Sequence, residues 1–380
     1  MTLNGNTPSK CIVGLFPELL GVGGVQEASR LTAAAIMASA QGHHWSVDFL
    51  SLNDAPGPHT LGMGGQTIIF HGFGRAKIRF VLAGLRAGRS TPSETTSVIV
   101  ATHPNLAVPA MLIRGNSPRF RTVVISHGIE VWKPLRGFRR RALARADVVL
   151  SPSSDTGQRL IDVQGIAKDK IRKLAWPISP AFLCLADAST PLIAPAAFPA
   201  GMVVLTVGRW AAAERYKGLD DLIRAIAQIR TEIPNLNLVA VGSGDDLPRL
   251  RRVAADSGVG DCVHFLENLS REELAACYSR ANVFALPSSG EGFGLVFLEA
   301  MAFSKPVVAA ACAGTKDVVE DDVNGLLVPP GDQAKLARAL VRLLSDVSLR
   351  DRLGRRGGEI VRNRYRFEIF QTALVSILDG

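Results

Sequence analysis

Residues 283–301 read VFALPSSGEGFGLVFLEAM and contain, in order, an apolar run, a glycine-rich loop and a helical pattern. The run at residues 283–286 is typical of a buried strand, and the glycines after it are typical of a tight turn. The helical pattern begins near residue 295, so the backbone amides at its start can hold an anion. Parallel sheets are built from strands that lead through such loops into helices, and the stretch therefore predicts an α/β fold.

The same alternation of apolar runs and helical patterns continues on both sides of this stretch. In the second half of the chain we predict strands at residues 203–207, 236–241, 263–266, 283–286, 307–310 and 326–328. In the first half we predict strands at residues 11–16, 47–50, 98–101, 122–126 and 148–150. Helices fill the intervals, one of them announced by a capping box from Ser270 to Glu273. Residues 52–97 show no pattern that predicts an element.

A length of 380 residues favours two domains of ordinary size. Residues 176–201 contain five prolines and little periodicity, which is typical of an interdomain connection. We therefore predict Rossmann-like domains at residues 1–175 and 202–360, joined by a Pro-rich linker at 176–201. A C-terminal helix within residues 361–380 could cross back to the N-terminal domain.

The cysteines and the apolar runs indicate in which cellular compartment the protein resides. The five cysteines are scattered and form no Cys-x-x-Cys pair, which favours a reducing compartment. The first apolar stretch is interrupted by Pro17 and Glu18, so it predicts a strand and not a signal peptide. No run approaches the roughly 18–20 apolar residues that a spanning helix needs. We therefore expect a cytoplasmic protein.

The positive charge lies in the first half of the chain. Residues 1–175 carry 21 Lys and Arg against 10 Asp and Glu, whereas residues 176–380 carry 22 against 24. A basic half can serve nucleic acid, an anionic membrane surface or a phosphorylated substrate, and the alternative is a solvated face. The sequence contains no zinc finger, RNA-recognition signature or aromatic-basic interleaving, so we expect no nucleic acid as a partner.

The segment from Trp132 to Leu143 mixes five basic residues with aromatic and aliphatic ones. This composition is typical of a segment that rests on a bilayer surface. It leads to the hypothesis that the protein binds an anionic membrane surface, peripherally at the inner face of the plasma membrane.

A glycine loop follows the first predicted strand. Gly23 and Gly24 stand at the start of a helix, where bare amides can approach an anion. The dinucleotide fingerprint needs a third glycine at the position of Gln26, so a nicotinamide enzyme is disfavoured. The alternative is a tight turn without a ligand.

Two cations flank the end of the strand at residues 203–207. Arg209 follows the strand directly, and Lys217 stands just before the helix that begins near Leu219. Ligands of open α/β sheets bind at the carboxyl ends of strands, where these two side chains could straddle a diphosphate. Taken singly, each could also be an ordinary surface charge.

The loop and helix at residues 287–301 add a second candidate anion cradle, formed by the amides of Gly294, Leu295 and Val296. Glu291 in the loop and Glu299 in the helix would be repelled by a phosphate, so we interpret them as acceptors for sugar and ribose hydroxyls. The alternative is that both are solvated glutamates.

Metal binding is not expected. Proteins that hold a nucleotide diphosphate through Mg²⁺ or Mn²⁺ offer carboxylates to the ion, often as Asp-x-Asp, and the chain contains no such triplet. Arg209 and Lys217 would supply the positive charge that the ion provides elsewhere.

Together these stretches resemble family 4 of the retaining glycosyltransferases, also called glycosyl transferases group 1, which have the GT-B fold. The stretches that carry the resemblance are Gly23-Gly24-Val25-Gln26, His127-Gly128-Ile129-Glu130, Gly208-Arg209, Lys217-Gly218, Glu291 through Glu299, and Asn324-Gly325-Leu326-Leu327-Val328. They occur in the family's order and in both predicted domains. The resemblance implies two doubly wound Rossmann-like domains that face each other across a cleft, the first receiving the acceptor and the second binding a nucleotide sugar.

The resemblance also implies roles for individual residues. Arg209 and Lys217 would hold the donor diphosphate and stabilise the departing nucleotide. Glu291 would bind the donor sugar, Glu299 the ribose hydroxyls, and His127 would face the sugar from the first domain.

Three further positions follow from the same resemblance. Gly23 and Gly24 would approach the phosphates or the acceptor, and Phe265 would lie near the base.

The implied function is a hexosyltransferase that moves a sugar, with retention, from a UDP- or GDP-sugar to a glycan or lipid-linked acceptor of cell-surface polysaccharide or glycolipid synthesis. It would need no cofactor besides the donor substrate. Two alternatives stay open. One is a nucleotide-sugar 2-epimerase of the same fold. The other is a non-catalytic nucleotide-sugar-binding partner, which would be expected to lack Glu291 or Lys217, although both are present.

Overall fold

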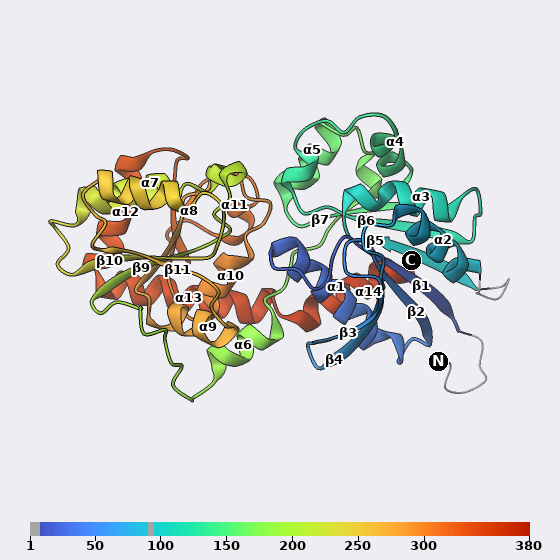
Figure 1. Ribbon diagram of the computed structural model, residues 1–380, viewed down its shortest axis with the longest axis horizontal. Helices are drawn as coiled ribbons and strands as arrows, with labels where there is room; N and C mark the ends of the chain where they lie inside the picture. The colour runs from blue at the N-terminus through green and yellow to red at the C-terminus, as the bar shows by residue number, and fades with distance from the viewer. Residues whose placement is uncertain (1–7, 90–94) are drawn as a thin grey trace. The chain divides into compact units, whose positions relative to one another are not determined.

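The computed structural model describes residues 8–89 and 95–380 (Figure 1). The chain divides into two compact units. The first unit comprises Met1–Pro177 together with Phe367–Gly380, and the second comprises Ile178–Arg366. Each unit is built around one sheet with helices on its faces, which confirms the predicted α/β class.

In the first unit, eight strands form the sheet among the described residues, in the order β3-β4-β2-β1-β5-β6-β7-β8. Their bounds are β1 Lys10–Phe16, β2 Trp45–Ser51, β3 Gly57–Met63, β4 Gln66–Gly72, β5 Thr96–Ala101, β6 Phe120–Ile125, β7 Val148–Ser151 and β8 Ile171–Lys173. The five strands predicted in this half are confirmed as β1, β2, β5, β6 and β7. The order of the sheet reverses between β1 and β5, which makes their carboxyl ends the switch point of this unit.

Three strands of this sheet were not predicted, namely β8 at one edge and the pair β3 and β4 at the other. β3 pairs with β4 in the antiparallel direction, whereas the other pairs of the sheet are parallel. Gly64 and Gly65 join the two strands and have φ angles of +56° and +76°. A two-residue turn with both φ angles positive suits glycine, because its lack of a Cβ removes the steric cost.

The helices of the first unit are α1 Gly24–Ala40, α2 Lys77–Arg89, α3 Ala107–Arg114, α4 Gly137–Arg145, α5 Ser154–Asp162 and α14 Phe367–Asp379. The last of these, at the C-terminus, packs on α1. Gln371 donates to Ser39 Oγ at 2.9 Å, and Lys10 Nζ donates to the Leu378 carbonyl at 2.8 Å. The C-terminal helix is therefore part of the first unit.

In the second unit, six parallel strands form the sheet among the described residues, in the order β11-β10-β9-β12-β13-β14. Their bounds are β9 Met202–Val207, β10 Leu236–Val241, β11 Val263–Leu266, β12 Val283–Leu286, β13 Val307–Ala310 and β14 Gly325–Val328. All six predicted strands are confirmed, four of them with the predicted bounds. The sheet order reverses between β9 and β12, so the switch point of this unit lies at their carboxyl ends.

The helices of the second unit are α6 Pro180–Asp187, α7 Leu219–Ile229, α8 Leu247–Asp256, α9 Arg271–Arg280, α10 Leu295–Ala302, α11 Thr315–Val318, α12 Gln333–Ser345 and α13 Val347–Arg364. The predicted capping box at Ser270 is confirmed at the start of α9. α6 lies within the segment expected to be a linker. The buried ring of Phe182 on α6 packs edge-on against Tyr278 and Phe303, which anchors this part of the segment in the second unit.

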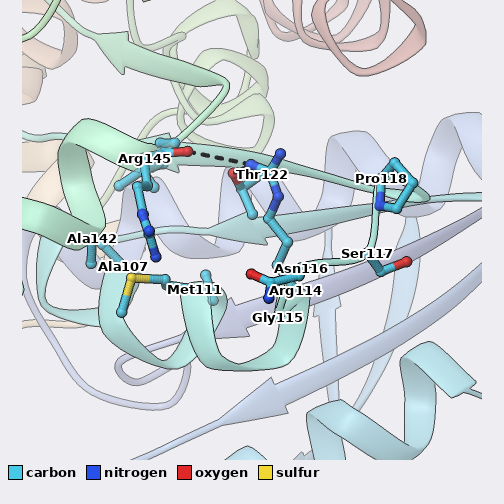
Figure 2. A pocket seen from close by; sticks show the side chains of 13 residues that line it. Ala107, Met111, Arg114, Gly115, Asn116, Ser117, Pro118, Thr122, Ala142 and Arg145 are labelled. Carbon is cyan, nitrogen blue, oxygen red and sulfur yellow. Dashed lines mark hydrogen bonds between the residues drawn. The ribbon is translucent and has the colours of Figure 1, made fainter.

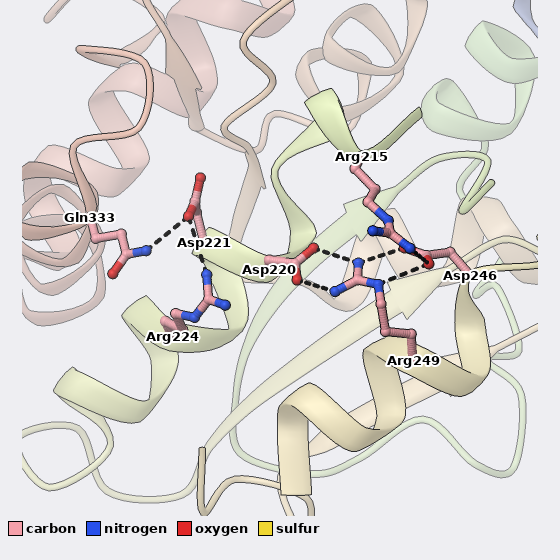
Figure 3. Close-up of polar contacts among 7 residues, drawn as sticks. All are labelled: Arg215, Asp220, Asp221, Arg224, Asp246, Arg249 and Gln333. Atoms are coloured by element: carbon pink, nitrogen blue, oxygen red, sulfur yellow. Dashed lines mark hydrogen bonds and ion pairs between the residues drawn. The ribbon is translucent and has the colours of Figure 1, made fainter. Parts of the chain in front are cut away.

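A polar network fixes the helices that follow β9 and β10 (Figure 3). Arg249 on α8 donates to Asp220 on α7 at 2.8 Å and to Asp246, the residue before α8, also at 2.8 Å. Asp246 is only 4% exposed and also accepts from Arg215 at 3.0 Å. Because Arg215 belongs to the loop between β9 and α7, the network holds that loop as well as the two helices.

Replacing Arg249 by alanine should leave the buried carboxylate of Asp246 underbonded and destabilise the second unit by about 2 kcal/mol. This corresponds to a fall of about 4–8 °C in the thermal midpoint. The hydrogen bonds from Arg249 lower the pKa of Asp220 and of Asp246. Lowered carboxyl pKa values stabilise the fold above the unfolded pKa and cease to do so as pH falls through the folded one.

The difference in thermal midpoint between wild type and Arg249→Ala should therefore be full at pH 7 and should shrink below about pH 4. Calorimetric scans at several pH values measure it. Arg252→Ala, which changes an exposed arginine on the same helix, is the matched control. A difference that persists unchanged at pH 3 would contradict the electrostatic origin of the effect.

Candidate functional site

The loop between β9 and α7 carries both predicted cations. It includes a short 3-10 helix, η4, at Ala212–Lys217, which ends at Gly218 with a φ angle of +75°. A Cβ at Gly218 would lie 2.6 Å from the carbonyl oxygen of Pro287, so the close approach of this loop to the end of β12 requires glycine. The amide of Ser289 donates to the Tyr216 carbonyl at 2.7 Å and ties the two loops together.

Arg209 and Lys217 meet around a third side chain that the sequence analysis did not single out. The carboxylate of Glu214 accepts a hydrogen bond from Arg209 and lies 3.5 Å from the Lys217 Nζ atom. The side chains of Glu214 and Lys217 are only 12% and 18% exposed, whereas that of Arg209 is 64% exposed. A carboxylate therefore bridges the two cations that were predicted to straddle a diphosphate.

The charges in this region are poorly solvated. Burial lowers the pKa of the Lys217 ammonium, and the negative charge of Glu291 offsets part of the effect. Burial likewise raises the pKa of the Glu291 carboxyl, and Lys217 acts against that rise. Lys217, in the loop after β9, and Glu291, in the loop after β12, thus each shift the pKa of the other. Such desolvated charges interact strongly with a charged ligand, because little water screens them.

The glycine-rich loop after β12 ends at Gly294, whose φ angle of +91° precedes the first residue of α10. The loop is held by the segment between β13 and α11, because the amide of Gly314 donates to the Glu291 carbonyl at 2.9 Å. The first amides of a helix have no partner inside it, so those of Leu295 and Val296 can serve an anion. The predicted helix start is confirmed. The role of these amides stays a prediction.

Glu299 lies in α10 and is fixed by Tyr278 of α9. The hydroxyl of Tyr278 donates to Glu299 Oε2 at 2.8 Å. Burial, followed by the charge of Glu299, raises the pKa of Tyr278 well above its ordinary value. The phenol therefore remains a donor, and it orients the carboxylate that was predicted to bind ribose hydroxyls.

Phe265 lies on β11, two strands away from β9 in the sheet. Its half-buried ring is covered by the guanidinium of Arg251, at 4.7 Å from the ring centroid. An arginine stacked on an aromatic ring forms a flat platform, as a nucleotide base requires. The position of Phe265 is consistent with the predicted base site, which stays a prediction.

In the first unit, His127 follows β6. Its Nε2 atom donates to the Thr102 carbonyl at 2.7 Å, so Nε2 carries a hydrogen and faces this carbonyl. The imidazole stacks between two other rings, with centroids 5.7 Å from His103 and 5.4 Å from Trp176. The carboxylate of Glu130 accepts from the amide of His127 at 2.6 Å. The ring is thus held rigidly at the carboxyl edge of the sheet.

His103, the other strand-end histidine, is held in the neutral form. Its Nδ1 accepts from the amide of Asn105 at 3.0 Å. Burial, and then the neighbouring His127, lower the pKa of His103 to about 4. His103 therefore carries no charge at neutral pH, and its ring stacks on that of His127.

Gly23 and Gly24 lie where the sequence predicted them, at the start of α1. Gly23 has a φ angle of +143° and precedes the helix, and a Cβ at Gly24 would meet no atom within 4 Å. The loop before them is fixed by the buried carboxylate of Asp54, which accepts from the amide of Leu19 at 2.7 Å. The space beside Gly24 leaves room for a ligand or a side chain, so the anion role stays a prediction.

The second unit thus brings Arg209, Lys217, Glu291 and the start of α10 together at its switch point. Among the described residues, no cluster of three or more His, Cys, Asp or Glu side chains could hold a metal ion. Within the same residues, no helix is long and apolar enough to cross a membrane.

The sequence of the chain is similar to those of known proteins. Residues 199–359 match the family described as glycosyl transferases group 1. The D-inositol 3-phosphate glycosyltransferase of Salinispora arenicola is 45% identical over 159 residues, which are 40% of this chain and 35% of that protein. A GDP-mannose-dependent alpha-(1-6)-phosphatidylinositol monomannoside mannosyltransferase of Mycobacterium tuberculosis is 36% identical over 43% of this chain and 44% of its own length. The matches thus span between a third and a half of these two curated relatives.

Solved structures agree over almost the whole chain. Sucrose-phosphate synthase from Thermosynechococcus elongatus superposes with a TM-score of 0.75 at 23% identity, covering 98% of both chains. The Anabaena protein HepE in complex with UDP superposes with a TM-score of 0.71 at 18% identity, covering 98% of this chain and 99% of that one. These likenesses establish the GT-B fold. Within that fold, residues 199–359 of the second unit match the glycosyl transferases group 1 family.

Proposed function

We propose that the protein is a glycosyltransferase that moves a sugar from a nucleotide-diphosphate sugar to an acceptor hydroxyl with retention of configuration. The observation that carries the proposal is the meeting of Arg209, Lys217, Glu291 and the start of α10 at the switch point of the second unit. Two cations, a helix N-terminus and a carboxylate suit the diphosphate and the hydroxyls of one nucleotide sugar.

The charges of the site support this reaction. As the bond between sugar and phosphate breaks, negative charge grows on the diphosphate and positive charge grows on the sugar ring. Arg209 and Lys217 are fixed before the reaction and would stabilise the first charge, which lowers the barrier. The acceptor hydroxyl attacks from the face that the leaving group vacates, and a phosphate oxygen takes its proton. No protein nucleophile is needed, and retention results.

The donor is a UDP- or GDP-sugar in this proposal. The name of the mycobacterial relative specifies GDP-mannose, and HepE was solved with UDP. The test is the thermal midpoint of the full chain in the presence of a panel of nucleotide sugars. One donor at a hundred times its Kd should stabilise the fold by about 2.7 kcal/mol, whereas the others should have little effect. A panel in which no nucleotide sugar stabilises the protein would overturn the proposal.

One incubation distinguishes this function from that of a 2-epimerase and from that of a non-catalytic binding partner. An epimerase converts the donor to an isomer without any acceptor, whereas a binding partner leaves it unchanged under all conditions. A transferase releases the nucleoside diphosphate in step with acceptor glycosylation. Chromatography of the donor after incubation with and without acceptor therefore distinguishes the three.

The acceptor proposed here is a lipid-linked or glycan hydroxyl that carries negative charge. The basic surplus of the first 175 residues favours an anionic acceptor, and the mycobacterial relative acts, by its name, on a phosphatidylinositol monomannoside. Cell-surface polysaccharide or glycolipid synthesis is the setting in which such acceptors occur. A cytoplasmic enzyme attached to the inner face of the plasma membrane would meet them there.

The surface of α4 supports such attachment in part. Phe138 is 71% exposed, and Arg139, Arg140 and Arg141 are exposed around it. Trp132, which the composition had included, is covered by the guanidinium of Arg159 at 4.7 Å from the ring centroid. Leu143 is buried in the same unit, so neither it nor the covered Trp132 is available to a membrane. The proposed membrane contact therefore consists of Phe138 and the three arginines.

Changing Arg139, Arg140 and Arg141 together to serine should reduce sedimentation with anionic vesicles severalfold, because each basic residue contributes about 1 kcal/mol near such a surface. Raised salt should weaken wild-type binding in the same direction. The measurement is co-sedimentation with anionic and neutral liposomes at two salt concentrations.

A matched variant changes Arg252, Arg338 and Arg355 of the second unit to serine. These arginines are also exposed, so the net charge falls equally while the surface of α4 stays intact. Binding that falls equally in both variants, or that is the same for neutral and anionic vesicles, would remove the membrane proposal. A soluble acceptor would then be favoured.

Sugar transfer should persist at a rate within about twofold when excess chelator removes divalent ions, because Arg209 and Lys217 supply the charge that faces the diphosphate. The measurement is initial rate with and without chelator, followed by addition of Mg²⁺ or Mn²⁺. Loss of turnover that either ion restores would show that the cations alone do not suffice.

A further inference from the structure

The first unit contains a cavity of about 370 Å³ between α3, α4 and β6 (Figure 2). Its lining includes Ala107, Ala110, Asn116, Thr122, Ala142 and Arg145. Thr122 lies in the first half of β6, whereas His127 lies beyond its other end. At a rise of about 3.3 Å per residue, the two are roughly 15 Å apart. The Thr122 end of the cavity is therefore distant from the carboxyl edge of the sheet, toward which the lining extends along α3 as far as Ala107.

The floor of the cavity is apolar because small residues face each other on two helices. Ala107 and Ala110 on α3, and Ala142 and Ala146 at α4, are each at most 3% exposed. The cavity opens to solvent at the exposed residues Gly115, Asn116 and Arg145, so it is a depression of the surface and not a packing void. An apolar group that entered it would displace water from the half-buried Met111 side chain and from the little of the alanine surface that is still exposed.

The rim of the cavity offers hydrogen-bond donors. Arg114 is engaged, since it donates to Asp147 at 2.7 Å and to the Arg145 carbonyl at 3.3 Å. In contrast, the guanidinium of Arg145 and the side chain of Asn116 make no hydrogen bond or ion pair within residues 8–89 and 95–380. Figure 2 shows the Arg145 side chain extending from the end of α4 toward the wall formed by Met111.

Negative charges at the rim limit which anions Arg145 and Asn116 can bind. α3 ends at Arg114 and α4 ends at Arg145, so the negative ends of both helix dipoles lie at the rim. Asp147 neutralises Arg114. A bare anion would therefore gain little from long-range attraction. It would need a direct contact with the Arg145 guanidinium together with an apolar body on the alanine floor.

We propose that this cavity binds a small amphiphilic anion, with a phosphate monoester or carboxylate head on Arg145 and Asn116 and an apolar body of roughly six carbons against the alanines. The two head groups share the acceptor oxygens that a guanidinium recognises. The site is accessory to the proposed transferase function and does not depend on it.

The test is isothermal titration calorimetry of the full chain with n-hexyl phosphate, heptanoate, n-propyl phosphate, hexanol and inorganic phosphate. Hexyl phosphate or heptanoate should bind, and the stronger of the two identifies the head group. Each buried methylene strengthens binding about fourfold, so propyl phosphate should bind at least tenfold more weakly than hexyl phosphate. Hexanol and inorganic phosphate each lack one half of the recognised chemistry and should bind at least tenfold more weakly too.

Arg145→Ala should weaken binding of the preferred anion at least tenfold, and Arg145→Lys should restore part of it. Arg145 is exposed, so neither variant should impair folding. Arg79→Ala is the matched control, because Arg79 is exposed on α2 and does not line the cavity. Ala107→Leu fills the floor and should abolish binding where its thermal midpoint equals that of wild type.

Three outcomes would overturn the proposal. The first is that neither hexyl phosphate nor heptanoate binds wild type. The second is that Arg145→Ala and Arg79→Ala bind equally well. The third is that UDP or GDP displaces the bound anion competitively, which would locate it at Arg209 and Lys217. Donor binding itself is measured separately, so a failure here leaves the transferase proposal untouched.

Discussion

Replacing Lys217 by alanine should lower the kcat of sugar transfer by about 10² or more while weakening donor binding much less. The reason is that negative charge on the diphosphate grows as the bond to the sugar breaks, so a fixed cation contributes most in the transition state. Arg209→Ala should act in the same direction. Steady-state kinetics together with calorimetric donor binding separate the two quantities.

The lowered pKa of Lys217 adds a pH dependence to this prediction. Burial moves the pKa below the ordinary value of 10.5, so the charged form is lost at a lower pH than for a solvated lysine. Turnover should therefore fall as pH rises through this lowered pKa. Lys217→Arg should move that loss to higher pH, because a guanidinium stays protonated.

Arg224→Ala, which changes an arginine of the next helix that pairs only with Asp221 among the described residues, should leave kcat unchanged. If Lys217→Ala instead lowered the thermal midpoint and the activity in parallel, the lysine would be structural. If donor affinity fell as much as kcat, its charge would act equally on the ground state and on the transition state.

The strands of the second unit were predicted closely from the sequence because they are buried on both faces. Runs such as residues 236–241 and 307–310 are almost wholly apolar and are separated by helical patterns, so their type and bounds are encoded locally. The strands missed in the first unit lie at the edges of the sheet. β8 consists of Ile171, Arg172 and Lys173, and β3 is half exposed with two glycines, so neither has an apolar run. The Gly64-Gly65 turn was the available signal for the hairpin.

The candidate site was predictable where a side chain follows a strand directly. Arg209 falls into this class, because the end of a parallel strand fixes where the next residues lie. Glu291 and Gly294 lie in the loop between β12 and α10, and both of these elements were predicted. Glu214 was not predictable, because its position depends on a kink inside η4, where its φ and ψ angles are −118° and +26°. Tyr278 and Trp176 were missed for a related reason. Each reaches Glu299 or His127 only through tertiary packing.

Glu214 also leads to a prediction with the opposite sign to that for Lys217. Its carboxylate presents to Arg209 and Lys217 the same kind of oxygens that a phosphate would present. A diphosphate must therefore displace the carboxylate or accept its repulsion. Glu214→Gln keeps the shape of the side chain and removes the charge, so it should tighten binding of the nucleoside diphosphate. Hydrogen bonds to charged groups are worth about 1.5–3 kcal/mol, which corresponds to a gain of about tenfold or more.

The same reasoning predicts that the product inhibits Glu214→Gln more strongly than wild type and that kcat falls wherever product release limits turnover. Calorimetric titration with UDP and GDP, together with product-inhibition kinetics, measures both effects. Glu272→Gln, on the exposed surface of α9, is the matched control for loss of one negative charge. If Glu214→Gln weakened diphosphate binding instead, the carboxylate would serve to hold the two cations together. The wild-type affinity measured in the same titrations shows whether the diphosphate site exists, so that result stays separate from the role of Glu214.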